Sequence, residues 1–176
     1  KKNYLSYAVS TGPDAAGSYH DNALIEQKNF YATYYNENPD YTFGEKVFDG
    51  SPLIRVKEQS KAGECWALQT GNTASNEQAT NQNGEVLLFE VDSDGRLEVT
   101  GSYNQGTLYK TIKWDADQHK TAEYKNKQGE VIEKKTHNGS QWQITHYVYD
   151  DLGRLRYVLQ PEAMASISGS GVVGIY

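Results

Sequence analysis

The sequence lacks residues on which several classes of protein depend. Its 176 residues include a single cysteine, Cys65, so an intramolecular disulfide and a cysteine-based zinc site are both excluded. No apolar run approaches the roughly 18 residues that a membrane-spanning helix needs, since the longest, residues 86–89, has only the length of a strand. Because Trp66 follows it, we expect Cys65 to be a small buried packing residue rather than a nucleophile.

Positive charge is also sparse, which limits the partners that the sequence suggests. The net charge is −6, and lysine and arginine are spread along the chain without a basic block. Nucleic acids and anionic membrane surfaces are bound by concentrated positive charge, so we expect neither as a partner and no insertion into a membrane. The chain begins at Lys1 without a methionine, and we expect any targeting segment to lie outside it.

Tyrosine is the residue that the chain has in abundance. Its 14 Tyr, 3 Trp and 4 Phe stand in a sequence that is only 37% hydrophobic and contains 16 Gly. Aromatic residues and glycine-rich turns are typical of strands and hairpins, so the composition predicts a mainly β fold of antiparallel hairpins. The length is enough for one core of ordinary size or for two small units.

The pattern of residues divides the chain into three regions. Residues 1–45 are predicted to form an N-terminal arm with one short helix, and residues 12–18 within them a loop. Residues 46–163 alternate between strands and turns, although the polar stretch 70–82 is predicted to be a long surface loop or an edge segment. Residues 164–176 are predicted to be a flexible C-terminal tail.

The short helix is predicted over residues 21–32. Asp21 is a plausible N-cap, because its carboxylate can accept a hydrogen bond from the free N–H groups of the first turn. Leu24, Lys28 and Tyr31 then share one stripe of the helix.

Turn signals recur in the β region at a regular spacing. Two similar blocks begin at residues 81 and 115, which are 34 residues apart, and similarity at a fixed period indicates a repeat architecture. Each unit follows the pattern Asp/Asn-x-x-Gly-x-Leu/Val, with an apolar or aromatic strand before and after it. The turn positions are Gly84, Gly95, Gln118, Gly129 and Gly153.

The repeat can be explained by turn chemistry. The Asp or Asn in the first position accepts a hydrogen bond from the backbone two residues on, and the glycine in the fourth supplies the positive φ that closes a short loop. The Leu or Val two residues later is predicted to begin the return strand on its buried face. Gln118 replaces glycine in one copy, so that turn is predicted to be differently shaped or strained. In the stretch 147–158, Asp150 and Gly153 belong to the turn and Asp151 lies at its tip.

The clearest copy of the unit resembles a known family. Residues 149–155, Tyr-Asp-Asp-Leu-Gly-Arg-Leu, are similar to the Tyr-Asp-x-x-Gly-Arg-Leu signature of the YD-repeat (RHS-repeat) family, and weaker copies cover 91–97 and 125–131. With landmarks at 48–56 and 106–110, the chain is most similar to the amino-terminal part of the core of a Bacteroidetes-type RHS protein. The turn residues that this resemblance singles out are Asp92, Gly95, Asn126, Gly129, Asp150, Gly153, Arg154 and Leu155.

The resemblance implies a structural function. It implies a curved sheet of YD-repeat hairpins that forms part of a β-shell, which encloses a cargo or toxin domain or serves as a surface scaffold for adhesion. It also implies a secreted or cell-surface protein without catalytic residues or cofactors. The expected partners are the remainder of a larger RHS polypeptide, its cargo or toxin domain, surface glycans, and further copies of the chain through exposed sheet edges.

Some residues also allow other chemistry. Asp92 and Asp94, with Glu98 as a distal ligand, suggest calcium, but a calcium loop needs more oxygen ligands, so a turn is favoured. No Gly-x-Ser-x-Gly elbow marks a nucleophilic serine. Histidine spacing suggests no metal pair, and His146 is predicted to be a partly buried, hydrogen-bonded imidazole. The histidines are His20, His119, His137 and His146.

A group of aromatic residues in the first half of the chain is the remaining candidate. It could form a stacking platform for carbohydrate, although core and cross-strand packing is the favoured explanation. The possible aromatic binding surface comprises Tyr31, Tyr34, Tyr35, Tyr41 and Trp66.

Overall fold

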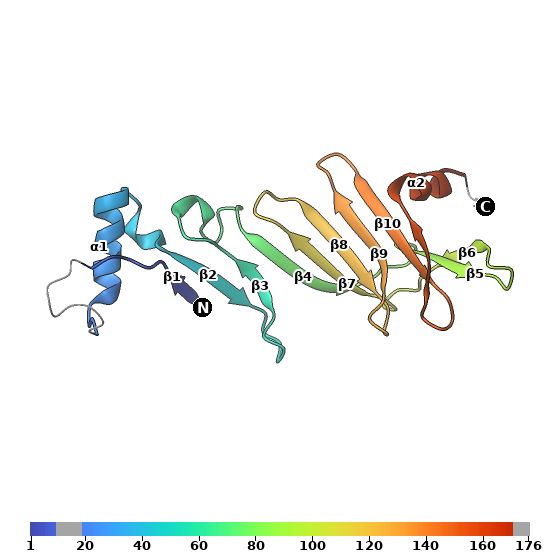
Figure 1. Ribbon diagram of the computed structural model, residues 1–176, viewed down its shortest axis with the longest axis horizontal. Coiled ribbons are helices and arrows are strands. Elements are labelled where there is room, and N and C mark those ends of the chain that lie inside the picture. The colour runs from blue at the N-terminus through green and yellow to red at the C-terminus, as the bar shows by residue number, and fades with distance from the viewer. Residues whose placement is uncertain (10–18, 171–176) are drawn as a thin grey trace. The chain divides into compact units, whose positions relative to one another are not determined.

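The computed structural model describes residues 1–9 and 19–170, and the side chains only as far as residue 167. The protein is mainly β, as predicted, with antiparallel strands and two α-helices (Figure 1). Its backbone contacts divide it into two compact units. Unit 1 comprises Lys1–Ser75 and the short segment Asp115–Gln118, and unit 2 comprises Asn76–Trp114 and the chain from His119 onward.

Unit 1 combines a helix with a small antiparallel sheet. The strands follow the order β1-β2-β3-β4, and β4 passes from unit 1 into unit 2. The elements are β1 (Lys2–Tyr4), α1 (Ala23–Tyr35), the 3₁₀ turn η1 (Pro39–Tyr41), β2 (Phe43–Phe48), β3 (Val56–Gln59), the 3₁₀ turn η2 (Glu64–Trp66) and β4 (Ala74–Thr80).

Helix α1 confirms the predicted helix but differs in its details. Asn22 rather than Asp21 is the N-cap, and it caps with its backbone carbonyl, which accepts from the N–H groups of Ile25 and Glu26. Leu24, on the predicted stripe, is 51% exposed, whereas the buried residue of the helix is Gln27. The helix therefore docks through a polar side chain.

Gln27 holds α1 to the two segments beside it. Its amide nitrogen donates to the carbonyls of Thr42 at 2.8 Å and Leu5 at 3.2 Å, and its amide oxygen accepts from the Thr42 hydroxyl at 3.0 Å. A buried amide with its donors and its acceptor satisfied costs little and fixes orientation. The stripe of Leu24, Lys28 and Tyr31 therefore does not contain the residue that anchors the helix, which is Gln27.

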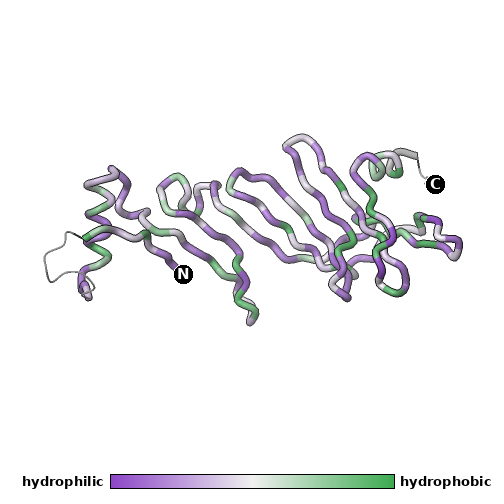
Figure 2. Tube along the Cα trace, viewed as in Figure 1, coloured by the Kyte–Doolittle hydropathy of each residue, from purple (hydrophilic) through white to green (hydrophobic). Residues whose placement is uncertain are grey.

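The loop or edge segment expected over 70–82 is wrong for residues 74–80, which form β4 with β3 and β7 (Tyr109–Trp114) as its neighbours in the strand order. Within unit 1 its first residues pair with β3, Ala74 with Gln59 and Ser75 with Glu58. The strand could not be recognised in the sequence, because most of its side chains are polar and exposed and the apolar alternation typical of strands is absent (Figure 2).

Unit 2 carries most of the strands. Its strand order is β4-β7-β8-β9-β10-β11, and β5 and β6 form a separate two-stranded sheet. The elements are β5 (Leu87–Val91), β6 (Leu97–Ser102), β7 (Tyr109–Trp114), β8 (Lys120–Lys125), β9 (Val131–His137), β10 (Trp142–Tyr149), β11 (Leu155–Leu159) and α2 (Pro161–Ser170).

Two hydrophobic clusters stabilise unit 2, and every fully buried hydrophobic residue in the described part of the chain belongs to one of them. The first lies around β7–β9 and comprises Val86, Leu108, Ile112, Ala122, Tyr124 and Ile132. The second joins β5–β6, β10, β11 and α2 and comprises Phe89, Leu97, Val148, Leu159, Met164 and Ile167.

Helix α2 stands where the sequence suggested a flexible tail from residue 164. Pro161 opens it, a position where the missing N–H costs nothing. Met164 and Ile167, three residues apart on one face, are 3% and 5% exposed in the second cluster. Their burial explains why this short segment is helical. Residues 171–176, and the loop predicted at 12–18, lie outside the described residues.

The predicted repeat turns are confirmed where they join paired strands. Gly95, Gly129 and Gly153 have φ values of 81°, 88° and 73°, and each closes a hairpin. Gln118 adopts φ 63° in the same role, and its side-chain amide donates to the Gly71 carbonyl within unit 1. Gly84 also has a positive φ, but its turn joins β4 and β5, which do not pair.

Replacing Gly153 with valine is expected to destabilise the protein by about 2 kcal/mol or more, because a β-branched residue is strained at positive φ. Gly153→Asn should cost less, since asparagine tolerates this conformation. Asp151→Ala, at the exposed tip of the same turn, should have little effect. Urea unfolding of the three variants measures the differences, and equal losses for valine and asparagine would contradict the conformational explanation.

Candidate functional site

Asp150 accepts more hydrogen bonds than Asp92, the carboxylate that holds the same position in another of the repeat turns. Its Oδ1 accepts from the backbone N–H groups of Leu152 and Arg154, each at 3.0 Å, and its Oδ2 accepts from Arg154 Nε at 2.8 Å. Arg156 Nη1 lies 3.5 Å from the same Oδ2. The backbone N–H of Arg154, with further hydrogen bonds from its guanidinium, lowers the pKa of Asp150. Both carboxylate oxygens of Asp150 are therefore engaged in hydrogen bonds that build the turn.

The other copies reproduce this geometry. Asp92 Oδ1 accepts from the Arg96 N–H at 2.7 Å, and Asn126 Oδ1 accepts from the N–H groups of Gln128 at 3.1 Å and Glu130 at 2.9 Å. In each turn the glycine N–H also donates to the carbonyl of the first residue. The predicted hydrogen bond from the backbone two residues on is confirmed at Asp150 and Asn126, whereas Asp92 accepts from the backbone four residues on.

The last position of the unit varies. Leu97, two residues after Gly95, is 6% exposed and belongs to the second cluster. Leu155, two residues after Gly153, is 50% exposed, so the expectation that it begins β11 on the buried face is wrong. The pairing of β10 with β11 is irregular between Val148 and Tyr149, next to the partner of Leu155, and this alters the alternation of faces there.

Unit 1 contains a related turn that the repeat pattern missed. Asp49 Oδ1 accepts from the Arg55 N–H at 3.0 Å, and Asp49 Oδ2 accepts from Arg55 Nε at 2.8 Å, as in the pair Asp150–Arg154. Hydrogen bonds from Arg55 and Ser51 lower the pKa of Asp49 to about 2. Six residues separate the pair instead of four, so a search at fixed spacing does not find it.

Acid is expected to weaken these turns. Because the folded-state pKa values of Asp49 and Asp150 lie below the unfolded value of about 3.9, the carboxylates stabilise the fold above pH 4. That contribution is lost as the pH falls from about 4 towards 2. Thermal unfolding between pH 2 and 6 should show this loss, and Asp150→Asn should make the profile flatter. An unchanged profile in the variant would contradict the role of Asp150.

Two of the repeat turns lie together in unit 2 and border an open, polar cleft of about 560 Å³. The Tyr157 hydroxyl donates to the Gly95 carbonyl and joins the β10–β11 hairpin to the β5–β6 hairpin. Asp92, which the sequence favoured as a turn residue over a calcium ligand, is used by its own turn, and Asp94 lies 3.7 Å from Arg96. These carboxylates are engaged in turn geometry and a surface ion pair.

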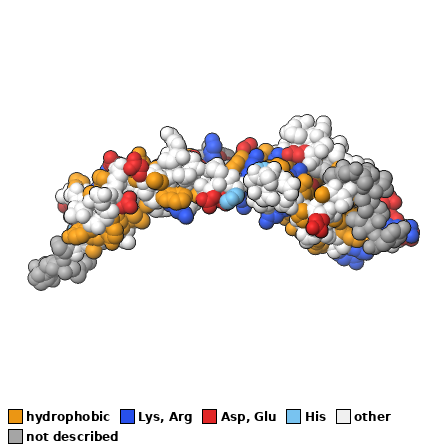
Figure 3. Space-filling model, turned by 90° about the horizontal axis from the view of Figure 1, so that it is seen from above, with side chains coloured by type: hydrophobic (Ala, Val, Ile, Leu, Met, Phe, Trp, Pro, Cys, Tyr) orange, Lys and Arg blue, Asp and Glu red, His pale blue; other side chains and the backbone are white. Residues whose placement is uncertain are grey.

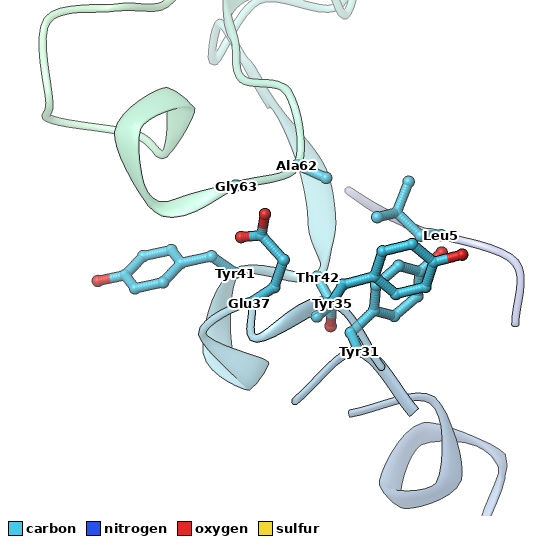
Figure 4. Close-up of a pocket in the computed structure, with 8 residues that line it drawn as sticks. All are labelled: Leu5, Tyr31, Tyr35, Glu37, Tyr41, Thr42, Ala62 and Gly63. Carbon is cyan, nitrogen blue, oxygen red and sulfur yellow. The ribbon is translucent and has the colours of Figure 1, made fainter. Parts of the chain in front are cut away.

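The aromatic candidates are brought together only in part. Tyr31, Tyr35 and Tyr41 line one pocket of about 160 Å³ in unit 1 (Figure 4). Tyr34 is 74% exposed and packs on Phe30, with the two ring centroids 5.1 Å apart. Trp66 lies in η2 and does not line the pocket. The full lining comprises Leu5, Tyr31, Tyr35, Glu37, Tyr41, Thr42, Ala62 and Gly63.

The end of α1 positions the rings of this pocket. Tyr31 and Tyr35 are four residues apart on one face, with ring centroids 5.4 Å apart and an interplanar angle of 32°. The Tyr31 hydroxyl donates to the Ser6 carbonyl at 2.5 Å, which fixes that ring. Asn36 then ends the helix in the left-handed conformation, with φ 53°, and turns the chain so that Glu37 also lines the pocket.

Glu37 is the functional candidate that the sequence reasoning missed. It is exposed, and its carboxylate forms no hydrogen bond or ion pair within the described part of the chain. In the view of Figure 4 its carboxylate lies between the Tyr41 ring and the rings of Tyr31 and Tyr35. The signal available in the sequence was the pattern Tyr-x-x-x-Tyr-Asn-Glu, in which asparagine ends a helix.

Ionisable side chains are also buried between β9 and β10. His146 and Glu133 face each other, are 1% and 2% exposed, and have Nδ1 and Oε2 3.3 Å apart. Lys135 Nζ lies 2.9 Å from Glu133 Oε1 as an ion pair, although not in hydrogen-bonding geometry, and donates to the Glu85 carbonyl at 3.0 Å. The predicted buried, partnered imidazole at His146 is confirmed.

This buried network continues to a tyrosine. The Tyr124 hydroxyl donates to Glu85 Oε1 at 2.8 Å, and Lys110 pairs with the same carboxylate. Burial and the Glu85 carboxylate raise the pKa of Tyr124. The ammonium groups of Lys110 and Lys135 lie 5.4 and 5.2 Å from the centroid of its ring. The network links β7, β8 and β9 to the chain before β5.

His20, His137 and the backbone carbonyl of Cys65 have local partners. His20 lies 2.9 Å from Glu26, and His137 accepts from the Gly139 N–H at 3.2 Å. The expectation that Cys65 is buried is wrong, because Cys65 lies exposed in η2. This turn is held by polar bonds to the Cys65 carbonyl, from the side chains of Thr70 and Asn72, rather than by apolar packing.

Comparison with known proteins gives one match. Residues 1–80 match a protein family described as a domain of unknown function (DUF6443). No curated protein and no solved structure matches the chain. The matched residues contain every residue of the Tyr31–Tyr35 pocket and end within β4, so they leave out the repeat turns at Asp92, Asn126 and Asp150. In the described ranges, neither α-helix has the length and hydrophobicity to span a bilayer.

Proposed function

We propose that the chain is a non-enzymatic structural segment of a larger, secreted or surface-exposed protein of the YD-repeat (RHS) type. The observation that supports this best is the repeated turn. At Asp92, Asn126 and Asp150 the same hydrogen bonds and the same positive-φ glycine build three hairpins in unit 2. Repetition of one local unit is how proteins extend a sheet by adding similar hairpins.

The arrangement of β11 supports an extended sheet. Within the described residues β11 pairs only with β10, so its other edge presents backbone N–H and C=O groups without a strand partner. Free edges are usually protected in isolated proteins. In the proposed function the next hairpin of the longer polypeptide pairs with β11, and successive hairpins build a shell around a cargo or toxin domain.

Small-angle scattering from the intact parent protein tests this function. A hollow particle, with a scattering profile that shows an internal cavity, is the expected result. A compact, solid particle would overturn the shell. Hydrogen exchange adds an internal control, because the amides of β11 that face away from β10 should be protected in the parent and exchange quickly in the 176-residue chain. Amides of β8, which lies between β7 and β9, should be protected in both.

A second candidate function is adhesion, in which the chain binds a surface glycan or a protein. The pocket lined by Tyr31, Tyr35 and Tyr41 favours it, because aromatic residues and the Glu37 carboxylate border the same accessible hollow. Loss of all ligand binding on Tyr35→Ala, with unfolding by urea unchanged, would support this function. If no glycan and no peptide binds the intact chain, the adhesion function is excluded.

A further inference from the structure

We infer that the pocket at the C-terminal end of α1 binds a cationic side chain, best an arginine, presented by a partner protein. The inference rests on the second function proposed above and names the chemistry of its ligand. It combines three properties of the pocket: the sign of its charge, its aromatic faces and its size.

Charge gives the first argument. Glu37 is the only ionisable acid or base in the lining other than tyrosine, and its carboxylate has no partner within the described residues. The neighbouring cations are engaged elsewhere, since Lys28 pairs with Asp40 at 2.8 Å and Lys61 lies 5.6 Å from the centroid of the Trp66 ring. Within the described residues, the pocket therefore carries one carboxylate without an ion-pair partner.

The helix adds to that charge. Glu37 stands two residues after the last residue of α1, and the last turn of α1 contains no basic side chain. The C-terminal end of a helix carries a partial negative charge from its free carbonyl groups, which lysine or arginine usually offsets. A ligand cation in this pocket would take the place of that missing basic residue.

The rings and the apolar atoms define the shape of the ligand. Tyr31 and Tyr35 present aromatic faces, and Leu5 and Ala62 provide an apolar wall. Guanidinium groups stack on aromatic faces and bind carboxylates with two parallel hydrogen bonds, and their aliphatic stems pack on apolar surface. An arginine side chain thus matches the ring faces, the wall and the carboxylate together.

Size and hydrogen bonding argue against a glycan. The volume of about 160 Å³ is below the roughly 300–1,000 Å³ of pockets that enclose a whole ligand, so the pocket holds one side chain. The Tyr31 hydroxyl already donates to Ser6, and the Thr42 hydroxyl donates to Gln27. Among the lining side chains of the described residues, this leaves the Tyr35 and Tyr41 hydroxyls and the Glu37 carboxylate for the several hydroxyls of a sugar.

Titrations of the intact chain, followed by the NMR signals of the tyrosine rings, test the inference. The probes are N-acetyl-arginine amide, the uncharged N-acetyl-norleucine amide and a methyl glucoside. The arginine probe is expected to shift the Tyr31 and Tyr35 signals, and Glu37→Gln should weaken its binding about fivefold. Glu77→Gln, an exposed carboxylate on β4 outside the pocket, is the matched control and should change nothing. Binding should also weaken as salt is added.

The other outcomes separate the inference from the function on which it rests. If the norleucine probe binds as well as the arginine probe, or the glucoside binds and the arginine probe does not, the cationic ligand is wrong while adhesion survives. If none of the probes shifts the ring signals and no peptide or glycan binds, both fail. Equal weakening by Glu37→Gln and Glu77→Gln would also overturn the assignment to this pocket.

Discussion

Lys135→Met is expected to lower the free energy of unfolding by about 3 kcal/mol. The substitution leaves Glu133, which is 2% exposed, without its ammonium partner 2.9 Å away, and breaking a buried pair on one side typically costs about 3–5 kcal/mol. The lower end applies because His146 Nδ1 remains 3.3 Å from Glu133 Oε2, so the carboxylate keeps one polar neighbour. Urea unfolding at neutral pH measures the loss.

The chain supplies a close control for this prediction. Lys134 precedes Lys135 on β9 but is exposed, so Lys134→Met should change stability by less than about 1 kcal/mol. Adding Glu133→Gln to Lys135→Met removes the uncompensated charge and should restore part of the loss. Equal effects of the two lysine substitutions, or no recovery in the double variant, would contradict a buried ion pair.

Leu108→Ala should cost about 3 kcal/mol. Leu108 is 1% exposed in the first cluster, and truncation of a buried leucine removes apolar contacts and leaves a cavity, typically at a cost of about 2–5 kcal/mol. Leu155→Ala is the matched control, because Leu155 is 50% exposed and should lose less than about 1 kcal/mol. Thermal and urea unfolding should agree, and a larger effect at Leu155 would mean that the signature leucine of the repeat is buried.

The features that the sequence predicts well are those encoded locally. The turns at Gly95, Gly129 and Gly153 form because the Asp or Asn and the glycine act within five residues, whatever surrounds them. The β class follows from the same turns and from aromatic strands. A pattern of this kind can be read without knowledge of tertiary contacts.

Features that depend on distant partners could not be predicted. Gln27 is buried because Leu5 and Thr42 offer it carbonyl groups, and Glu133 is buried because Lys135 and His146 lie beside it. The sequence contains these residues but not their proximity. The pocket was predicted in part. The abundance of tyrosine made Tyr31, Tyr35 and Tyr41 candidates, whereas Glu37 was not singled out.

Hydrophobic burial is distributed unevenly between the two units. In the described ranges all fully buried hydrophobic residues belong to unit 2, whereas the buried residues of unit 1 are polar: Gln27, Thr42, Ser60 and Thr73. Large hydrophobic side chains of unit 1 are exposed instead, among them Ile25, Leu53 and Ile54, and Figure 3 shows hydrophobic side chains on the surface. Apolar burial is the main force that opposes opening of a folded segment.

The consequence concerns regulation by mass action. A region that opens at low free-energy cost exchanges its amide hydrogens early. A ligand that binds only the closed form raises the free energy of opening by an amount that grows with the logarithm of the ligand concentration. When a ligand occupies the pocket of unit 1, the amide hydrogens of unit 1 should therefore exchange more slowly. Its folded population would then depend on its surroundings, while the repeat hairpins of unit 2 stay closed with or without a partner.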